Sequence, residues 1–185
     1  MRREGLDDRS ERLVRAARDL ANESGSAAFT VTQVTARAGL SLKAFYGCFR
    51  GKDELLLALL AADSAIGAEV LGDRIGDRRG ADAVRAYVVE LFDMLGLPGA
   101  AGYAGVLVRE YLRLSEHYGD ELRAALAPLL DLLARDLDSP HPHRDALTMF
   151  GVLLGGIHDV VVRGSTERRA LAEYLHRFCT QGIGA

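Results

Sequence analysis

The stretch FTVTQVTARAGLSLKAFYGCF, residues 29–49, contains two helix-start signals separated by a glycine. Thr30 and Gln33 have the spacing of a capping box, in which each side chain bonds the backbone N–H of the other residue. Gly39 adopts positive φ without a steric penalty, and glycine at this place commonly ends a helix. The stretch therefore predicts a short helix over residues 31–38 that ends in a tight turn.

A second helix start follows this turn at once. Ser41 is a favoured N-cap residue, and the stretch after it predicts a helix over residues 42–48. Two short helices joined by a tight glycine-containing turn are typical of a helix-turn-helix. We expect the apolar residues of this pair to pack on the preceding helix, and these are Ala36, Ala38, Leu40, Phe45 and Phe49. The residues left partly or wholly exposed are then Leu42, Lys43, Ala44, Tyr46 and Gly47.

Outward from this motif, a helical period covers almost every segment, and no run has the period of a strand. Asp8 with Glu11 is a plausible cap for the first helix, and Pro128 should kink or split the seventh. The fold class is therefore all-α, with about nine helices. They are expected over residues 8–24, 31–38, 42–48, from 52 to a loop at 72–80, 81–96, 102–116, 120–137, 143–163 and 167–179.

Charge is distributed unevenly along the chain. Residues 1–52 hold 10 Lys or Arg and 6 Asp or Glu, a balance of +4. Residues 53–185 hold 13 basic and 20 acidic residues, a balance of −7, which gives the net charge of −3. A basic first part joined to an acidic remainder suggests that the first part meets a polyanion such as nucleic acid.

The sequence also bears on the compartment and on cofactors. Cys48 and Cys179 lie far apart, with no metal-ligand spacing, so two free thiols in a reducing compartment are expected. The first residues contain no apolar signal segment, and the longest apolar run, residues 55–62, is too short to span a bilayer. We therefore expect a cytoplasmic protein with no membrane partner, no metal and no cofactor.

The same motif residues are similar to a known family. Residues 30–41, followed by Phe45-Tyr46, Phe49, Lys52 and Leu55-Leu56, resemble the DNA-binding segment of TetR-like transcriptional regulators, the tetracycline-repressor family. The resemblance covers residues 9–60. It implies a homodimer that binds a double-stranded DNA operator with one recognition helix per half-site. It also implies that binding of a small molecule releases the protein from this operator.

The resemblance also implies roles for single residues. Lys43 can donate to guanine O6 and N7, whereas Tyr46, Lys52 and the threonine hydroxyls suit phosphate oxygens. The expected DNA contacts are Thr30, Thr32, Ser41, Leu42, Lys43, Ala44, Tyr46 and Lys52. Two features depart from the family pattern: Leu42-Lys43-Ala44 replaces a frequent Lys-Gly-Thr or Lys-Gly-Ser, and Cys48 replaces a frequent histidine. They put the operator sequence in doubt, not the fold.

The remaining helices are expected to bind the effector and to form the dimer. We divide the chain into a helix-turn-helix domain over residues 1–52 and a ligand-binding and dimerisation domain over residues 53–185. A mostly apolar pocket favours a hydrophobic or amphipathic ligand. The expected pocket residues are Ile66, Leu91, Phe92, Leu95, Tyr103, Leu107, Tyr111 and Met149. The expected dimer interface comprises Phe150, Leu153, Leu154, Ile157, Val161, Leu171, Tyr174, Leu175 and Phe178.

Two other functions stay open on the sequence alone. The first is a DNA-binding regulator without an inducer, controlled by a protein partner. The second, from another class, is an all-α enzyme. It is disfavoured because the sequence has no nucleophile–base pair, carboxylate dyad, phosphate loop or metal cluster.

Overall fold

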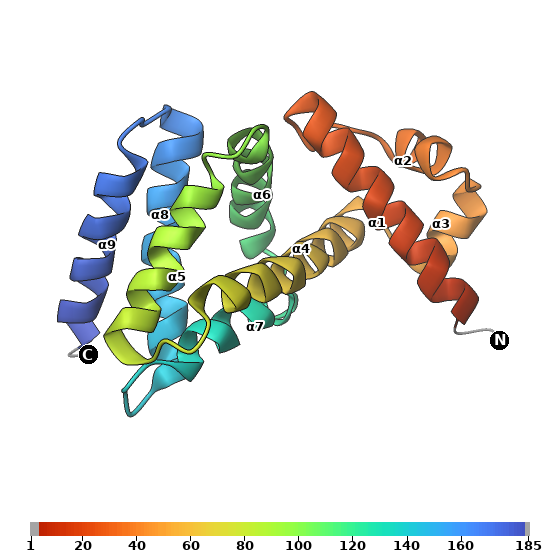
Figure 1. Ribbon diagram of the computed structural model, residues 1–185. Coiled ribbons are helices and arrows are strands. Elements are labelled where there is room, and N and C mark those ends of the chain that lie inside the picture. The colour runs from red at the N-terminus through yellow and green to blue at the C-terminus, as the bar shows by residue number, and fades with distance from the viewer. Residues whose placement is uncertain (1–3, 184–185) are drawn as a thin grey trace.

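The computed structural model describes residues 4–183, and within that range it is built from nine α-helices and no strand (Figure 1). The all-α prediction is therefore confirmed. The helices are α1 (Glu4–Ser24), α2 (Val31–Ala38), α3 (Leu42–Cys48), α4 (Lys52–Ile75), α5 (Gly80–Met94), α6 (Ala100–Ser115), α7 (Gly119–Arg135), α8 (Pro142–Arg163) and α9 (Arg168–Ile183).

The helix-turn-helix forms as the local signals predict. The backbone N–H of Gln33 donates to Thr30 Oγ1 at 3.2 Å, and the N–H of Thr30 donates to Gln33 Oε1 at 2.7 Å, so the capping box is complete. Gly39 ends α2 in the left-handed region at φ 63°. Ser41 Oγ accepts from the N–H of Ala44 at 3.1 Å and caps α3. The starts of α2 and α3 therefore follow from side chains within four residues of each boundary.

Two local expectations are wrong, and a third, at Pro128, is wrong in that α7 is not split there. Helix α1 begins at Glu4, so Asp8 lies inside it and does not cap it. Ala36 is exposed, because α2 turns a different face toward α1. Pro128 lies inside an uninterrupted α7. A proline removes one N–H and crowds the carbonyl four residues earlier, and here that residue, Ala124, is exposed to solvent.

Helix α4 joins the head, which we define as α1 to α3, to the body, α5 to α9 (Figure 1). It packs along α7 and also contacts α1, α5 and α6. One hydrophobic cluster runs from Leu13 and Phe45 in the head through Leu55 of α4 to Leu126 of α7 and Phe150 of α8. A second cluster fills the space between α5, α8 and α9. The head therefore shares a continuous core with part of the body.

Two helices, α4 and α8, are long and apolar enough by composition to cross a membrane. In the structure both pack against α7, and their inward residues are core residues, such as Leu59 of α4 and Met149 of α8. A helix that is apolar on more than one side is normally covered on more than one side. Packing between helices thus covers part of the apolar surface of α4 and α8.

Candidate functional site

The outer face of α3 is exposed while its inner face is locked in the core. Tyr46 is 61% exposed, and Leu42 and Lys43 lie beside it at the surface. On the opposite side Phe45 is fully buried, and its ring contacts that of Phe49 at 5.8 Å between centroids. A helix held this way presents its N-terminal side chains outward, which is what entry into a DNA major groove requires.

Lys43 is available for a contact outside the protein. Its ammonium makes no hydrogen bond or ion pair with any residue in the described part of the chain. With Arg9 of α1 it lines a surface groove of about 460 Å³ along α3. Two other cations of the head are engaged: Arg37 pairs with Glu23 at 2.7 Å, and Arg12 donates to the carbonyl of Ala38 at 2.7 Å. Lys43 is therefore well placed to donate to base edges.

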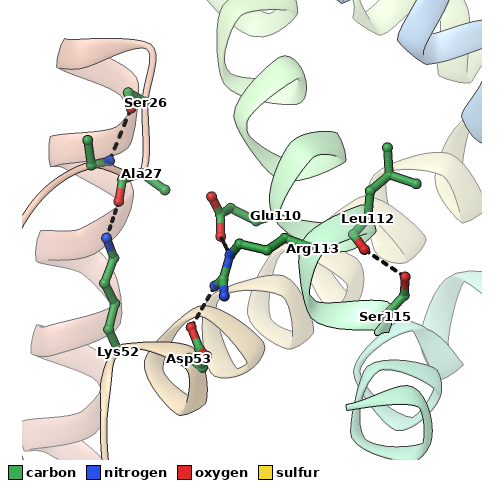
Figure 2. Close-up of polar contacts among 9 residues, drawn as sticks. Ser26, Ala27, Lys52, Asp53, Glu110, Leu112, Arg113 and Ser115 are labelled. Carbon is green, nitrogen blue, oxygen red and sulfur yellow. Dashed lines mark hydrogen bonds and ion pairs between the residues drawn. The ribbon is translucent and has the colours of Figure 1, made fainter. Parts of the chain in front are cut away.

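Lys52 is differently placed from Lys43. Its ammonium donates to the backbone carbonyl of Ala27 (Figure 2). It also lies 4.8 Å from the ring centroid of Phe29. Burial lowers its pKa from the ordinary lysine value. Lys52 thus ties the start of α4 to the loop between α1 and α2. A phosphate contact would compete with this bond, and the expected phosphate role stays a prediction.

Helix α6 reaches the same junction from the body. Arg113 pairs with Asp53 at 2.6 Å and with Glu110 at 2.8 Å (Figure 2). The hydrogen bond to Asp53 raises the pKa of Arg113, so the guanidinium stays charged. One turn earlier, Arg109 donates to the carbonyl of Gly25, just after α1, at 3.0 Å. The head is therefore held by α6 as well as by α4.

A cavity of about 170 Å³ lies between α4 and the body. Its lining comes from five helices and the residue after α5, and most of it is apolar. The lining residues are Leu60, Asp63, Ser64, Tyr87, Leu91, Leu95, Ala104, Leu107, Val108, Tyr111, Leu126, Leu129, Phe150, Leu154 and Ile157. Two polar residues of α4, Asp63 and Ser64, interrupt this lining. An apolar cavity with few polar groups is the usual form of a small-molecule site.

Asp63 connects the cavity wall to the head. Its Oδ1 accepts from Arg18 of α1, with Nη2 at 2.6 Å and Nε at 2.8 Å, and its Oδ2 accepts from the hydroxyl of Tyr103 of α6 at 2.5 Å. We call these three residues the Asp63 bridge. Burial opposes the charge of Arg18, but Asp63 outweighs it and raises the pKa of Arg18. Burial, and then Asp63, raise the pKa of Tyr103, so its phenol stays a donor.

The comparison with protein families concerns the segment that holds this exposed helix. Residues 13–59 match the bacterial regulatory proteins of the tetR family. Over this segment the chain resembles the TetR-like transcriptional regulators. The match ends early in α4, so it covers the helix-turn-helix and leaves the cavity outside. No curated protein matches the sequence.

Solved structures extend the TetR-like fold to the whole chain. The transcriptional regulator FadR from Bacillus subtilis in complex with stearoyl-CoA is 17% identical, with a TM-score of 0.66 over 94% of this chain and 98% of that one. A TetR transcriptional regulator from Rhodococcus sp. RHA1 is 18% identical, with a TM-score of 0.68 over 94% and 95%. NemR of E. coli in its reduced form is 18% identical, with a TM-score of 0.66 over 94% and 96%. At these identities the likeness shows the fold alone.

The expected pocket residues separate into two groups. Leu91, Leu95, Leu107 and Tyr111 line the cavity, and Tyr103 reaches it through Asp63. The other three do not line this cavity, and a ligand-binding role for them stays a prediction. Ile66 is 52% exposed on the outer side of α4, beside α1, while Phe92 and Met149 are enclosed in the second core cluster.

The expected dimer residues also divide by burial. Tyr174 and Phe178 are exposed, and their rings stack at 6.5 Å between centroids. Half-buried members are Leu154, Val161 and Leu171, and buried ones are Phe150, Leu153, Ile157 and Leu175. Leu153 has no exposed surface in the protomer, which disfavours its expected contact with a partner. Phe150, Leu154 and Ile157 line the cavity instead.

Sequence reasoning missed Asp63 and Ser64. Both had a visible signal, because they are the two polar residues between Leu55 and Gly67 in an otherwise apolar stretch of α4. A carboxylate within such a stretch calls for a partner, since an isolated buried charge is costly. The partner, Arg18, comes from 45 residues earlier in the chain, which no local pattern indicates.

Proposed function

We propose that this TetR-like protein is a homodimeric repressor that leaves its DNA operator when a small molecule enters the cavity beside α4. The observation that carries the proposal is Asp63, which lines the cavity and at the same time pairs with Arg18 in α1. Such a regulator acts in the cytoplasm, where the DNA lies. A relative by fold, FadR from Bacillus subtilis, was solved with stearoyl-CoA, which supports ligand binding by this architecture.

On DNA, α3 would lie in the major groove with Lys43 toward base edges. The hydroxyls at the start of α2, with Ser41 and Tyr46, would contact phosphates and set the register. Leu42 and Ala44 would meet the groove by apolar contact, for instance with a thymine methyl. The proposed DNA-contacting set is Thr30, Thr32, Ser41, Leu42, Lys43, Ala44 and Tyr46, with Lys52 at its edge.

The second copy would sit on the exposed faces of α8 and α9. Gly151 and Gly155 lie exposed four residues apart on α8, and a Cβ added at either would meet nothing within 4 Å in the protomer. On α9 the stacked rings of Tyr174 and Phe178 provide apolar area. Bare helix backbone on α8 and exposed rings on α9 both favour close helix packing across a twofold axis. In Figure 1, α8 and α9 lie at the end opposite the head, which leaves the head free for DNA.

Release from the operator would follow when a ligand disturbs the Asp63 bridge. Without ligand, Asp63 holds α1 against α4 and, through Tyr103, against α6. A ligand in the cavity would press on Asp63 and on the α6 wall, and α6 also holds the head through Arg109 and Arg113. The two heads would then shift relative to the half-sites. Ligand and DNA must weaken each other's binding by the same factor.

The test of this proposal is the substitution Asp63→Asn, measured by the operator affinity of the ligand-free protein. It keeps the shape of the side chain and removes the charge that holds Arg18. We expect operator affinity to fall at least about fivefold, the lower end of typical coupling between sites. The fall is opposite in sign to the effect of net charge, since losing a carboxylate makes the protein more attractive to DNA.

Glu23→Gln is the matched control for this test. It makes the same change in charge and also breaks an ion pair in the head, the one with Arg37, but that pair is exposed and does not touch the cavity. We expect its operator affinity to be unchanged or slightly higher. If Asp63→Asn strengthens operator binding as Glu23→Gln does, Asp63 acts only through the net charge and the coupling route is wrong.

The second candidate function, control by a protein partner without an inducer, makes a different prediction about the packing of the helices. A structure with helices α4 to α7 packed solid would favour it. The cavity of about 170 Å³ favours the small molecule instead.

A further inference from the structure

The cavity restricts its ligand by size. Its volume of about 170 Å³ is close to that of an engineered cavity of roughly 150 Å³ that binds benzene. The walls are fixed by helices on several sides, from Leu60 of α4 to Ile157 of α8. A single ring with a few further atoms fits this space, whereas the volume of a long acyl chain exceeds it.

Ser64 provides a place for one hydrogen bond. It is 3% exposed, it lines the cavity, and its hydroxyl has no hydrogen-bond partner in the described part of the chain. Two neighbouring polar residues are already engaged: Asp63 accepts from Arg18 and Tyr103, and the Tyr87 hydroxyl donates to the carbonyl of Leu129 at 3.5 Å. A buried hydroxyl without a partner is unfavourable, so a ligand that bonds it gains affinity.

The charges around the cavity exclude an anionic ligand. The ionisable residues in its lining are Asp63, Tyr87 and Tyr111, and no Lys, Arg or His is among them. A carboxylate or phosphate placed here would lose its hydration without gaining a cation, and it would face the carboxylate of Asp63. Arg18 is committed to Asp63 from the side of α1.

We propose that the effector is a neutral, single-ring compound with one hydroxyl group, such as a simple phenol, which bonds the hydroxyl of Ser64 inside this cavity. The inference rests on the proposed function, because it names the ligand class of the same site. Ser64 can both donate to and accept from such a hydroxyl. The apolar walls cover the ring.

Three probes of similar size test the proposal by titration calorimetry: p-cresol, toluene, which lacks the hydroxyl, and 4-methylbenzoate, which is charged. We expect the wild-type protein to bind p-cresol about five- to tenfold more tightly than toluene, as one hydrogen bond provides. We expect 4-methylbenzoate to bind least tightly. Ser64→Ala should remove the preference for p-cresol and leave toluene bound as tightly as before, or more tightly.

Ser115→Ala is the control, since this serine is exposed at the end of α6 and donates to the carbonyl of Leu112 (Figure 2). It should bind all three probes as the wild type does. The proposal is overturned if p-cresol and toluene bind equally, if 4-methylbenzoate binds most tightly, if none of the three binds, or if Ser64→Ala keeps the preference.

A parallel measurement of operator release separates this inference from the proposed function. If p-cresol binds through Ser64 and the operator stays bound, the ligand class is right and the repressor mechanism is wrong. If p-cresol does not bind but another class of molecule fills the cavity and releases the operator, the mechanism stands and the ligand class is overturned.

Discussion

Replacing Tyr174 and Phe178 together by glutamate should make the protein monomeric and lower its operator affinity at least about 100-fold. The reason is that two linked heads bind two half-sites as one unit, and separate heads lose the advantage of a high effective concentration. Both rings are more than half exposed in the protomer, so the change should cost little in the fold of each chain. Across a twofold axis the new carboxylates would face one another and lose hydration.

The control for this prediction is the double substitution Leu97→Glu with Leu112→Glu. These leucines are also about half exposed, but they lie outside α8 and α9, and the change in charge is the same. Sedimentation equilibrium and fluorescence anisotropy with an operator duplex measure both outcomes. The proposed interface is wrong if Tyr174→Glu/Phe178→Glu remains dimeric, or if the control dissociates to the same extent.

Lys43→Ala should reduce the preference for the operator over a scrambled duplex by about 1–3 kcal/mol per half-site. Lys43 is exposed on α3 and is not bonded to any residue in the described range, so its loss should leave the fold intact. Binding to the scrambled duplex should fall only slightly, because the protein loses one charge per subunit. The measurement is the ratio of the two dissociation constants at one salt concentration.

Lys52→Ala provides the contrast. It removes the same charge, and we expect it to weaken binding to both duplexes alike and to lower the salt slope by about one per subunit. Since the Lys52 ammonium also holds the carbonyl of Ala27, thermal unfolding of this variant should be followed in parallel. If the two lysine variants change the preference equally, Lys43 does not read bases.

The head could be predicted from the sequence because its signals are local. The capping box of Thr30 and Gln33 and the capping hydroxyl of Ser41 each act within three residues, and each fixes a helix end. The exposure of Tyr46 follows from the same pattern, because Phe45 and Phe49 fill the inner side. Failures of local reasoning occur at Asp8, where a good cap residue lies within a longer helix.

The cavity could be predicted only in part, because it depends on which face of each helix turns inward. Helix α8 is apolar over much of its circumference, so its sequence does not say that Phe150 and Ile157 line a cavity while Leu153 lies in the core. The role of Asp63 depends on its ion pair with Arg18, which lies far away in the chain. Tertiary contacts of this kind carry no periodic signal.

The most direct test of the central claim is to sequence the genomic DNA fragments that the purified protein retains at moderate ionic strength. Because the account requires two exposed α3 helices related by a twofold axis, the retained fragments should share an inverted repeat. Its half-sites should be a whole number of DNA turns apart, roughly 34–36 Å per turn. Retention that matches the input DNA at every salt concentration, or enrichment without any repeat, would contradict the account.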